Sequence, residues 1–484
     1  MMRRFILALT LLVGGATSAD AAAARYWRIQ CVTEGALCVF TEVELHTSIG
    51  GSQAATGGTA SASTTLGAFV PALAFDGNTS TFWASANTAP PHWIAYDMGS
   101  GNSIDVVEVK LYPRGGGDEN QSPRWIYIES SSDGSTWTTR WTAVAATWVA
   151  STPQTFAKPA TLTSNGGHRW WRVDVHRTQS QGAVGFSNIA MAATSGGTNL
   201  LPGALPDASG YFGALYPWNG NDSNTTTSDW AIASAPSQWW SADLLSGNSQ
   251  PVTEVKITAR NASPGSGNDQ APLRFCTKYS DDGSTWVTSW CSISTGAWTS
   301  NEVRTFLRPS YADALTGGHR CWRVVGATAQ DASNIMAGSK VTLYIAGNNE
   351  VMAWAEPTVD STTTGSGYNL TDADTTTIWA SANTAYPHYV QFDFGTEFAP
   401  SIRRVAWTSR NDSSFAQAPA TGSLQYSDDC SSWTTYVSYS VSWTQNQTQD
   451  LVNVPSGGAR GYIFGANDNW PRVLIREDRC EIAA

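Results

Sequence analysis

Apolar and polar residues alternate along many short segments of this chain. Val107, Val109 and Leu111 alternate with polar neighbours in one such segment. A period of two residues is that of a β-strand with one buried face. Asp-Gly stands between such runs at 133–134 and 282–283, and it is a strong short-range signal for a β-hairpin. Because long segments of helical period are absent and polar turn residues fill the loops, the pattern predicts an all-β chain of antiparallel sandwiches.

Four motifs recur three times in the same order and with nearly the same spacing. They are a tryptophan after a polar loop, a strand-like segment ending in Asp, a Ser-rich hairpin and a Gly-Gly-His-Arg segment. The copies are Trp83, Trp230 and Trp379; Asp97, Asp243 and Asp393; 131–137, 280–286 and 427–433; 166–173, 317–324 and, weakly, 457–464. The tryptophans lie 147 and 149 residues apart. This period is too long for a solenoid repeat and matches a whole domain, so we expect three tandem domains.

The domain boundaries depend on the phase of the repeat. Residues 25–45 contain RYWRI and FTEVEL, which look like the closing element of a unit but come first. Either the units are circularly permuted, or an orphan closing element precedes three units in normal order. We favour normal order, because the chain ends in a weak closing element of its own. The expected divisions are a closing-like element at 25–47 and units at 48–195, 196–346 and 347–484, the second being divergent.

Residues 1–24 have the features of a secretory signal peptide. Arg3 and Arg4 precede a nine-residue apolar run, and small residues follow with an A-x-A pattern at 19–21. Nine residues are too few to span a bilayer, and no other stretch is long and apolar enough to do so. We therefore expect a protein that is secreted or displayed on the cell surface.

All seven cysteines follow the predicted signal, and an oxidising compartment permits disulfides. Cys31 and Cys38 form one local candidate pair. Cys276 and Cys291 form a better founded pair, since they flank a predicted hairpin. An odd number leaves at least one cysteine unpaired, and no cluster has the spacing of a zinc site.

The composition excludes several classes of protein. Charged residues make up 14%, against about 25% in ordinary soluble proteins, and the net charge is −11 with only five lysines. With 23 tryptophans the chain is not a disordered polyelectrolyte, and it lacks the basic patch that nucleic-acid binding requires. No GxSxG, HExxH or P-loop motif is present, and carboxylate pairs such as Asp281-Asp282 fall in predicted hairpin turns. The sequence therefore favours a protein that is not an enzyme.

The repeated tryptophans are predicted to be structural. One set follows the polar loops and consists of Trp83, Trp230 and Trp379. The other set follows the hairpins and consists of Trp137, Trp286 and Trp433. We expect the first set to anchor its loops to the core, and the second to belong to the core by covering a sheet face.

These motifs, in this order, resemble the discoidin or coagulation-factor type C family, also called F5/8 type C, within the galactose-binding-like jelly rolls. Unit one matches best, and its matching residues are Asp76-Gly77-Asn78, Thr81, Trp83, Asp97-Met98-Gly99, Asp133-Gly134, Trp137 and 169–173. Unit two departs, because Asn219-Gly220-Asn221 replaces the acidic loop and Asp243-Leu244-Leu245 lacks the glycine. The resemblance implies three tandem antiparallel β-sandwiches of the jelly-roll, galactose-binding-like kind.

The resemblance also implies a structural calcium ion beside the DGN-like loop, in units one and three. Calcium prefers oxygen ligands from carboxylates, hydroxyls and carbonyls. The candidate ligands are Asp76, Asn78, Thr81 and Glu42 in unit one, and Asp372, Asp374, Thr377 and Glu481 in unit three. Glu42 fits this role only in the permuted phase, and Glu481 only in normal order. In the other interpretation Asp76 and Asp372 merely cap turns. Unit two has Asn219 in place of a carboxylate, so no calcium is expected there.

Ligand contact in this family usually falls on loops at one end of the sandwich. The candidate residues are Arg114, Arg260 and Arg410, which precede the long mid-domain loop, and His92, His388 and Tyr386 in the near-identical segments 84–92 and 380–388. An arginine fork can hold a carboxylate or neighbouring sugar hydroxyls, and a tyrosine ring can stack on a sugar. The arginines can equally pair with loop carboxylates, and the repeated segments can be scaffold.

The function implied is that of a secreted, non-catalytic protein that binds a glycan or glycoprotein on a surface or matrix. Three weak sites on one chain would act by avidity. The alternative is a structural or adhesion component of a virion or bacterial surface appendage, and the sequence leaves the oligomeric state open. An accessory region of an enzyme is disfavoured, because the repeats almost fill residues 25–484.

Overall fold

The computed structural model describes residues 23–32 and 37–454, with gaps at 90, 146, 165, 181, 226–227, 235–236, 263–266, 295 and 373, and strands 473–476 and 479–482. Residues 1–22 of the predicted signal peptide and the weak motif at 457–464 lie outside the described residues. The described residues form β-strands and short 3₁₀ helices, which confirms the all-β class. The 3₁₀ helices are η1 (Pro71–Ala74), η2 (Glu119–Gln121), η3 (Pro217–Asn221), η4 (Asn268–Gln270), η5 (Ala312–Ala314), η6 (Ala346–Asn348), η7 (Met352–Trp354), η8 (Gly367–Leu370) and η9 (Phe415–Gln417).

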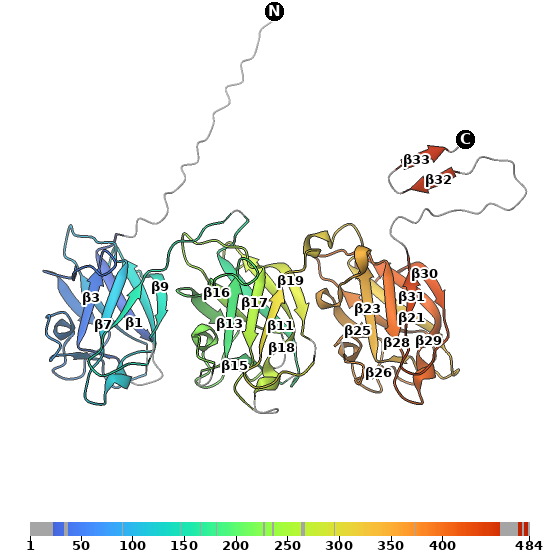
Figure 1. Ribbon diagram of the computed structural model, residues 1–484, viewed down its shortest axis with the longest axis horizontal. Helices are drawn as coiled ribbons and strands as arrows, with labels where there is room; N and C mark the ends of the chain where they lie inside the picture. Colours follow the sequence, from blue (N-terminus) through green and yellow to red (C-terminus); the bar gives the residue numbers. More distant parts are fainter. Residues whose placement is uncertain are drawn as a thin grey trace, which may run out of the picture. The chain divides into compact units, whose positions relative to one another are not determined.

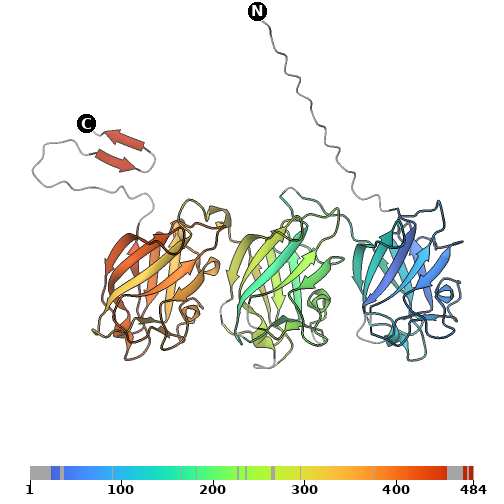
Figure 2. The same ribbon diagram turned by 180° about the vertical axis from the view of Figure 1, so that it is seen from behind.

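The chain divides into two compact units, unit 1 and unit 2, which do not coincide with the three units of the sequence repeat. Unit 1 contains residues up to Arg169 together with 200–205 and 243–251, and unit 2 contains the remainder. The strands of the two units form three pairs of antiparallel sheets, which Figures 1 and 2 show in colours that follow the sequence.

The first sheet pair lies in unit 1. Its five-stranded sheet has the order β4 (Thr59–Ala62), β6 (His92–Asp97), β1 (Tyr26–Val32), β8 (Trp125–Ser131) and β9 (Thr138–Val144). Its three-stranded sheet has the order β10 (Gln154–Ala157), β7 (Glu108–Tyr112) and β3 (Glu42–His46). Alternate residues of both sheets, such as Ile29 and Leu111, join one buried hydrophobic cluster, as strands with one buried face require. A short ladder joins β2 (Val39–Phe40) to β5 (Trp83–Ala84).

The second and third sheet pairs lie in unit 2, apart from Leu205 and Asp243 at the ends of two strands, which belong to unit 1. The second consists of β14 (Leu205–Ala208), β16 (Gln238–Asp243), β11 (Trp170–Thr178), β18 (Pro272–Ser280) and β19 (Val287–Ile293), with β13 (Asn188–Ala192), β17 (Glu254–Thr258) and β20 (Val303–Leu307). The third consists of β25 (Glu356–Val359), β27 (His388–Asp393), β21 (Cys321–Ala329), β29 (Pro419–Ser427) and β30 (Thr434–Ser440), with β24 (Asn349–Glu350), β23 (Lys340–Ile345), β28 (Arg404–Thr408) and β31 (Thr448–Asn453). The remaining ladders are β12 (Val184–Phe186) with β15 (Trp230–Ile232), β22 (Ala337–Gly338) with β26 (Trp379–Ala380), and β32 (Val473–Arg476) with β33 (Arg479–Ile482).

Strand pairing corrects the expected phase of the repeat. β1 lies at the centre of the first five-stranded sheet, between β6 and β8. β11 pairs with β18, and β21 pairs with β27 and β29. Boundaries at 48, 196 and 347 would therefore remove a central strand from each sheet and expose its backbone groups. The sheets follow the permuted alternative, in which the RYWRI-like strand comes first in each pair.

An ion pair explains why an Asp ends each repeated strand. Arg25 donates two hydrogen bonds to Asp97 at 2.6 and 2.7 Å, and the pairs Arg169–Asp243 and Arg320–Asp393 repeat this contact. The same carboxylates accept the N–H of the residue two positions later, which is Gly99, Leu245 or Gly395. Leu245 adopts a left-handed φ of 70°, so the turn survives where the glycine is missing.

Charged side chains also join the two sheet pairs of unit 2. Glu356 on β25 contacts His176 at 2.8 Å and Arg274 at 3.0 Å, and it accepts a hydrogen bond from Tyr368. Burial alone would raise the pKa of Glu356, but the hydrogen bond from His176 and the charge of Arg274 outweigh it and lower the pKa to about 2. The carboxylate therefore stays ionised and links strands of two sheets.

Candidate functional site

The predicted ligand residues of the first sheet pair lie at one end of it. His92 begins β6 opposite Cys31 near the end of β1, and Trp125 begins β8 opposite Val32. Arg114 lies in the connection that leaves β7 and leads into β8. Because these strand ends lie at the same end of the sheet, the segments that lead into β6 and β8 belong to this end of the first sheet pair, which we call its loop end.

Arg114 lies on an aromatic platform at this loop end. Its guanidinium is 4.6 Å from the ring centre of Phe82, and Phe82 stacks on Phe69 with centroids 4.2 Å apart. The arginine pairs with Asp118 at 3.0 Å, yet its side chain remains 36% exposed. Leu66 and Val70 add further exposed apolar surface. The platform therefore offers a guanidinium fork beside apolar surface, a combination that suits an amphipathic ligand.

The corresponding arginines of the other two sheet pairs are more enclosed. Arg260 contacts Asp229 at 3.0 Å and donates to Gln270, and Arg410 contacts Asp412 at 2.6 Å. Their side chains are only 15% and 16% exposed. Both therefore pair with loop carboxylates, which is the alternative to ligand contact that the sequence left open. Arg114 is the most accessible of the three arginines.

The two predicted histidines and Tyr386 lie inside their loops. His92 and His388 are each about 1% exposed. His92 Nε2 pairs with the carbonyl of Thr88 at 3.0 Å. His388 contacts Asp360 at 2.6 Å, and Tyr386 donates to the carbonyl of Ile335 at 2.8 Å. These contacts give the three side chains a part in fixing the loops.

The DGN-like loop of the first sheet pair brings two carboxylates together. Asp76 accepts hydrogen bonds from the N–H of Asn78 and the hydroxyl of Thr81, both at 2.8 Å, which is how a turn-capping aspartate behaves. Glu42, at the start of β3, is 4% exposed and accepts the N–H of Gly77. Burial, with the charge of Asp76 nearby, raises the pKa of Glu42 to about 7. A buried carboxylate facing a second one is a donor set that a hard cation fits.

The second sheet pair keeps this loop but changes its charge. Asp222 accepts the N–H of Asn224 and the hydroxyl of Ser228, so it corresponds to Asp76. The sequence pattern had placed Asn219-Gly220-Asn221 in the position of the acidic loop, so Asp222 was missed. Asn188 stands at the start of β13, where β3 has Glu42, and accepts the N–H of Ser223. An amide thus replaces the second carboxylate.

In the third sheet pair the corresponding loop is contacted by an arginine of the second sheet pair, and a lysine stands where β3 has Glu42. Asp372 accepts the hydroxyl of Thr377 at 2.8 Å, and Asp374 accepts that of Thr376 at 2.7 Å. Arg177 of β11 contacts Asp372 at 3.2 Å. Lys340 begins β23, where β3 has Glu42. These residues fit a calcium ion poorly, since an arginine already neutralises Asp372. Glu481 lies on β33, and its side chain is outside the described residues.

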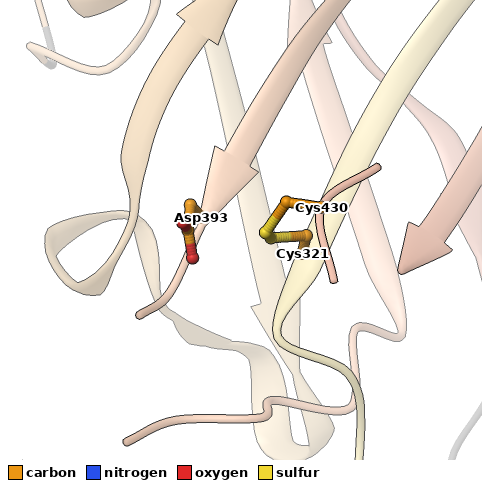
Figure 3. Close-up of side chains that lie close together, drawn as sticks. All are labelled: Cys321, Asp393 and Cys430. Carbon is orange, nitrogen blue, oxygen red and sulfur yellow. A yellow bond between two sulfur atoms is a disulfide. The ribbon is translucent and has the colours of Figure 1, made fainter. Parts of the chain in front are cut away.

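The disulfides include both predicted pairs and a third. Cys31 bonds to Cys38 and Cys276 to Cys291, as expected. Cys321 bonds to Cys430, a pairing across 109 residues that the sequence did not reveal. Figure 3 shows Asp393 beside this disulfide. Because both sulfur atoms are bonded to each other, this group has no thiolate to offer a metal.

Two aromatic arrangements were not foreseen. At the polar loop of the second sheet pair, Tyr216 stacks on Trp218 and packs at a tilt against Tyr211. The hairpin tryptophans 137, 286 and 433 are only half-buried, so their assignment to the core was wrong. They lie over arginines on the outer face of the five-stranded sheets, because the hairpin carries them beyond the buried face. The loop tryptophans 83, 230 and 379 are fully buried, as expected.

The order of the strands bears on the comparison with known families. Residues 59–163 and 353–463 match the family model of the F5/8 type C domain. Both matches leave out the first central strand of their sheet pair, β1 or β21. Residues 164–352, with the second sheet pair, have no such match. No curated protein matches the chain.

F5/8 type C domains often bind carbohydrates or other ligands, are often adhesive and are generally non-catalytic. They occur in extracellular or surface proteins. Within the part of the chain that the structure describes, no helix is long and apolar enough to cross a membrane.

Proposed function

We propose that this protein is a secreted, non-catalytic binding protein that attaches to glycans or glycoproteins on a surface or matrix. The observation that carries the proposal is the Arg114 platform at the loop end of the first sheet pair. It presents a partly exposed guanidinium beside the stacked rings of Phe82 and Phe69. A guanidinium can hold sugar hydroxyls or a sugar carboxylate, while the neighbouring rings accept the apolar face of a pyranose.

The proposal includes one structural calcium ion, in the first sheet pair only. Asp76 and Glu42 would supply carboxylates, and Asn78 and Thr81 further oxygens, as the resemblance implies. Its role is to neutralise two facing carboxylates and hold the DGN-like loop against β3. The third sheet pair, where Arg177 and Lys340 provide positive charge, is not included.

A glycan array with the mature protein, in calcium and in EDTA, tests the function. We expect binding to at least one glycan class, and Arg114→Ala should weaken it at least about tenfold because the fork is lost. Arg308→Ala is the matched control, since Arg308 pairs with Asp313 in a different loop. Binding to no glycan, together with self-association on size exclusion, would instead favour the surface-appendage alternative.

A further inference from the structure

The outer face of each five-stranded sheet carries an arginine between two aromatic rings. The guanidinium of Arg28 lies 4.3 Å from the ring centre of Trp137 and 5.8 Å from that of Trp93. The equivalent distances are 4.4 and 5.4 Å for Arg172 with Trp286 and Trp239, and 4.2 and 5.2 Å for Arg323 with Trp433 and Tyr389. This arrangement lies on the sheet face and is separate from the loop end that contains Arg114.

In the first sheet pair these rings border an open hollow. β1 alternates buried and partly exposed residues, so Tyr26 and Arg28 face away from the core that holds Trp27 and Ile29. The register places Ala95 opposite Arg28. A hollow of about 260 Å³ lies here, and it is lined by the aromatic residues Tyr26, Trp93 and Trp137, by Ala95, by the hydroxyl residues Thr59 and Ser61, and by Asp97. It exists because a methyl group stands where a longer side chain would fill the space.

The charges around the hollow are internally paired. Arg28 donates to Glu129 at 2.6 Å, and Arg25 neutralises Asp97, the carboxylate that lines the hollow. The hollow therefore combines aromatic rings and hydroxyl groups with little net charge. This combination matches a neutral pyranose ring, whose C–H face packs on indole and whose hydroxyls need polar partners. An anionic lipid headgroup or acidic sugar would find no unpaired cation here among the described contacts.

We propose that this hollow is a second glycan subsite that binds a neutral hexopyranose unit. This inference deepens the proposed function and rests on it, but it places the contact on the sheet face rather than on the loops. A long glycan could then engage the face and the loop end of one sheet pair, and two contacts on one molecule strengthen each other.

The other two copies differ from the first in the residues that line the hollow, and the second sheet pair has Leu205 and Asp207 where the first has Thr59 and Ser61. In the second sheet pair Ser241 stands two residues before Asp243, as Ala95 stands two before Asp97, and Trp170 corresponds to Tyr26. In the third, Gln391 lies opposite Arg323, and Cys321 takes the place of the ring. We therefore assign the subsite to the first sheet pair.

Isothermal titration with neutral tetrasaccharides of glucose, galactose and N-acetylglucosamine tests the subsite, using the full mature chain in an Arg114→Ala background that removes the loop contact. We expect binding to persist in this background. Trp137→Ala and Ala95→Leu should each weaken it about tenfold or more, the first by removing a lining ring and the second by filling the hollow. Trp137→Phe should restore most of the affinity, because it keeps a ring. Trp433→Ala, the matched change in the third sheet pair, should have no effect.

The outcomes distinguish the two proposals. Neutral sugars that bind the wild type but are lost entirely in Arg114→Ala would overturn the face subsite and leave the proposed function standing. A glycan array that shows only acidic sugars would do the same. Binding in the Arg114→Ala background that Trp137→Ala and Ala95→Leu leave unchanged, with unaltered melting curves, would also overturn the subsite. A wild type that binds no glycan would overturn the proposed function as well.

Discussion

Cys321 and Cys430 form a disulfide at the place where the other two sheet pairs have an aromatic ring against a glycine. In the first pair, a Cβ on Gly134 would lie 3.1 Å from the ring of Tyr26. In the second, a Cβ on Gly283 would lie 3.2 Å from the ring of Trp170. The third pair has Cys321 in register with those rings and Cys430 at the turn position. A covalent bond thus replaces a packing contact between the first central strand and the hairpin.

Removal of this disulfide should destabilise the third sheet pair. The bond closes a loop of 109 residues, and limiting the unfolded chain to this extent is worth about 5 kcal/mol in the chain-entropy account. We expect Cys321→Ser with Cys430→Ser to lower the melting temperature of one calorimetric transition. Cys321→Trp with Cys430→Gly recreates the second pair's contact and should recover part of the loss. An equal melting temperature for the two double variants would contradict the equivalence.

Gly134 should resist substitution for two separable reasons. Its φ of 75° is left-handed, and an added Cβ would meet the ring of Tyr26. Gly116 has a φ of 79°, but a Cβ there meets nothing within 4 Å. Gly116→Ala should therefore cost about 1 kcal/mol from backbone strain alone, and Gly134→Ala clearly more, because the ring must move. Urea denaturation of the two variants measures the difference. Equal costs would show that the ring yields freely.

Calcium binding by the first sheet pair should depend on pH through Glu42. Without the ion the pKa of Glu42 is raised to about 7, so below that pH binding must displace a proton. Affinity should rise about tenfold per pH unit up to near pH 7 and then level off. Terbium luminescence sensitised by tryptophan provides the measurement. Glu42→Gln should abolish the pH dependence and weaken binding, whereas Asp372→Asn should change neither. Unaltered binding in Glu42→Gln would contradict the assignment.

The same carboxylate predicts how stability varies with pH in EDTA. A folded-state pKa raised above the ordinary value of 4.5 gives stability that is complete below pH 4.5 and is lost as the pH rises through about 7. The melting temperature of the first sheet pair should therefore fall over this range in EDTA and recover when calcium is added. Glu42→Gln should melt at a temperature that is nearly constant across it.

Glu356 should make the stability of unit 2 depend on pH in the opposite direction from Glu42. Its pKa is lowered from 4.5 to about 2, so its contribution is present above pH 4.5 and is lost as the pH falls through about 2. Glu356→Gln removes the countercharge of Arg274 and His176 and should lower the melting temperature of unit 2 at pH 7. The difference from the wild type should shrink in acid. A constant difference from pH 7 to pH 2 would contradict the ionic role.

Much of the fold could be read from local patterns. Period-two alternation predicted the strands, and Asp-Gly marked two hairpins, where Asp133 and Asp282 accept the N–H groups two and three residues ahead. These contacts lower the pKa of both aspartates, because hydrogen bonds to the ionised form stabilise it. The loop tryptophans were also predictable as core, since a large ring after a polar loop gains most by burial.

The site could be predicted only in part. Repetition marked Arg114, Arg260 and Arg410 equally, and only the structure shows that the last two are more enclosed by their loops. Repetition likewise marked His92 and His388, whose burial depends on contacts that sequence spacing does not encode.

The sequence by itself determined the strands and hairpins, because these depend on neighbours within a few positions. It also determined the repeat and most of the residue types at the loop end, because the copies can be recognised by comparing the chain with itself. Only the tertiary structure decided the phase of the repeat, the Cys321–Cys430 bond, the cation that Arg177 brings to Asp372, and the hollow over Ala95. Each of these joins residues that are far apart in the chain, and a strand such as β11 has the same alternating pattern whichever sheet it enters. Which partners satisfy its backbone and bury its side chains is settled by packing in three dimensions.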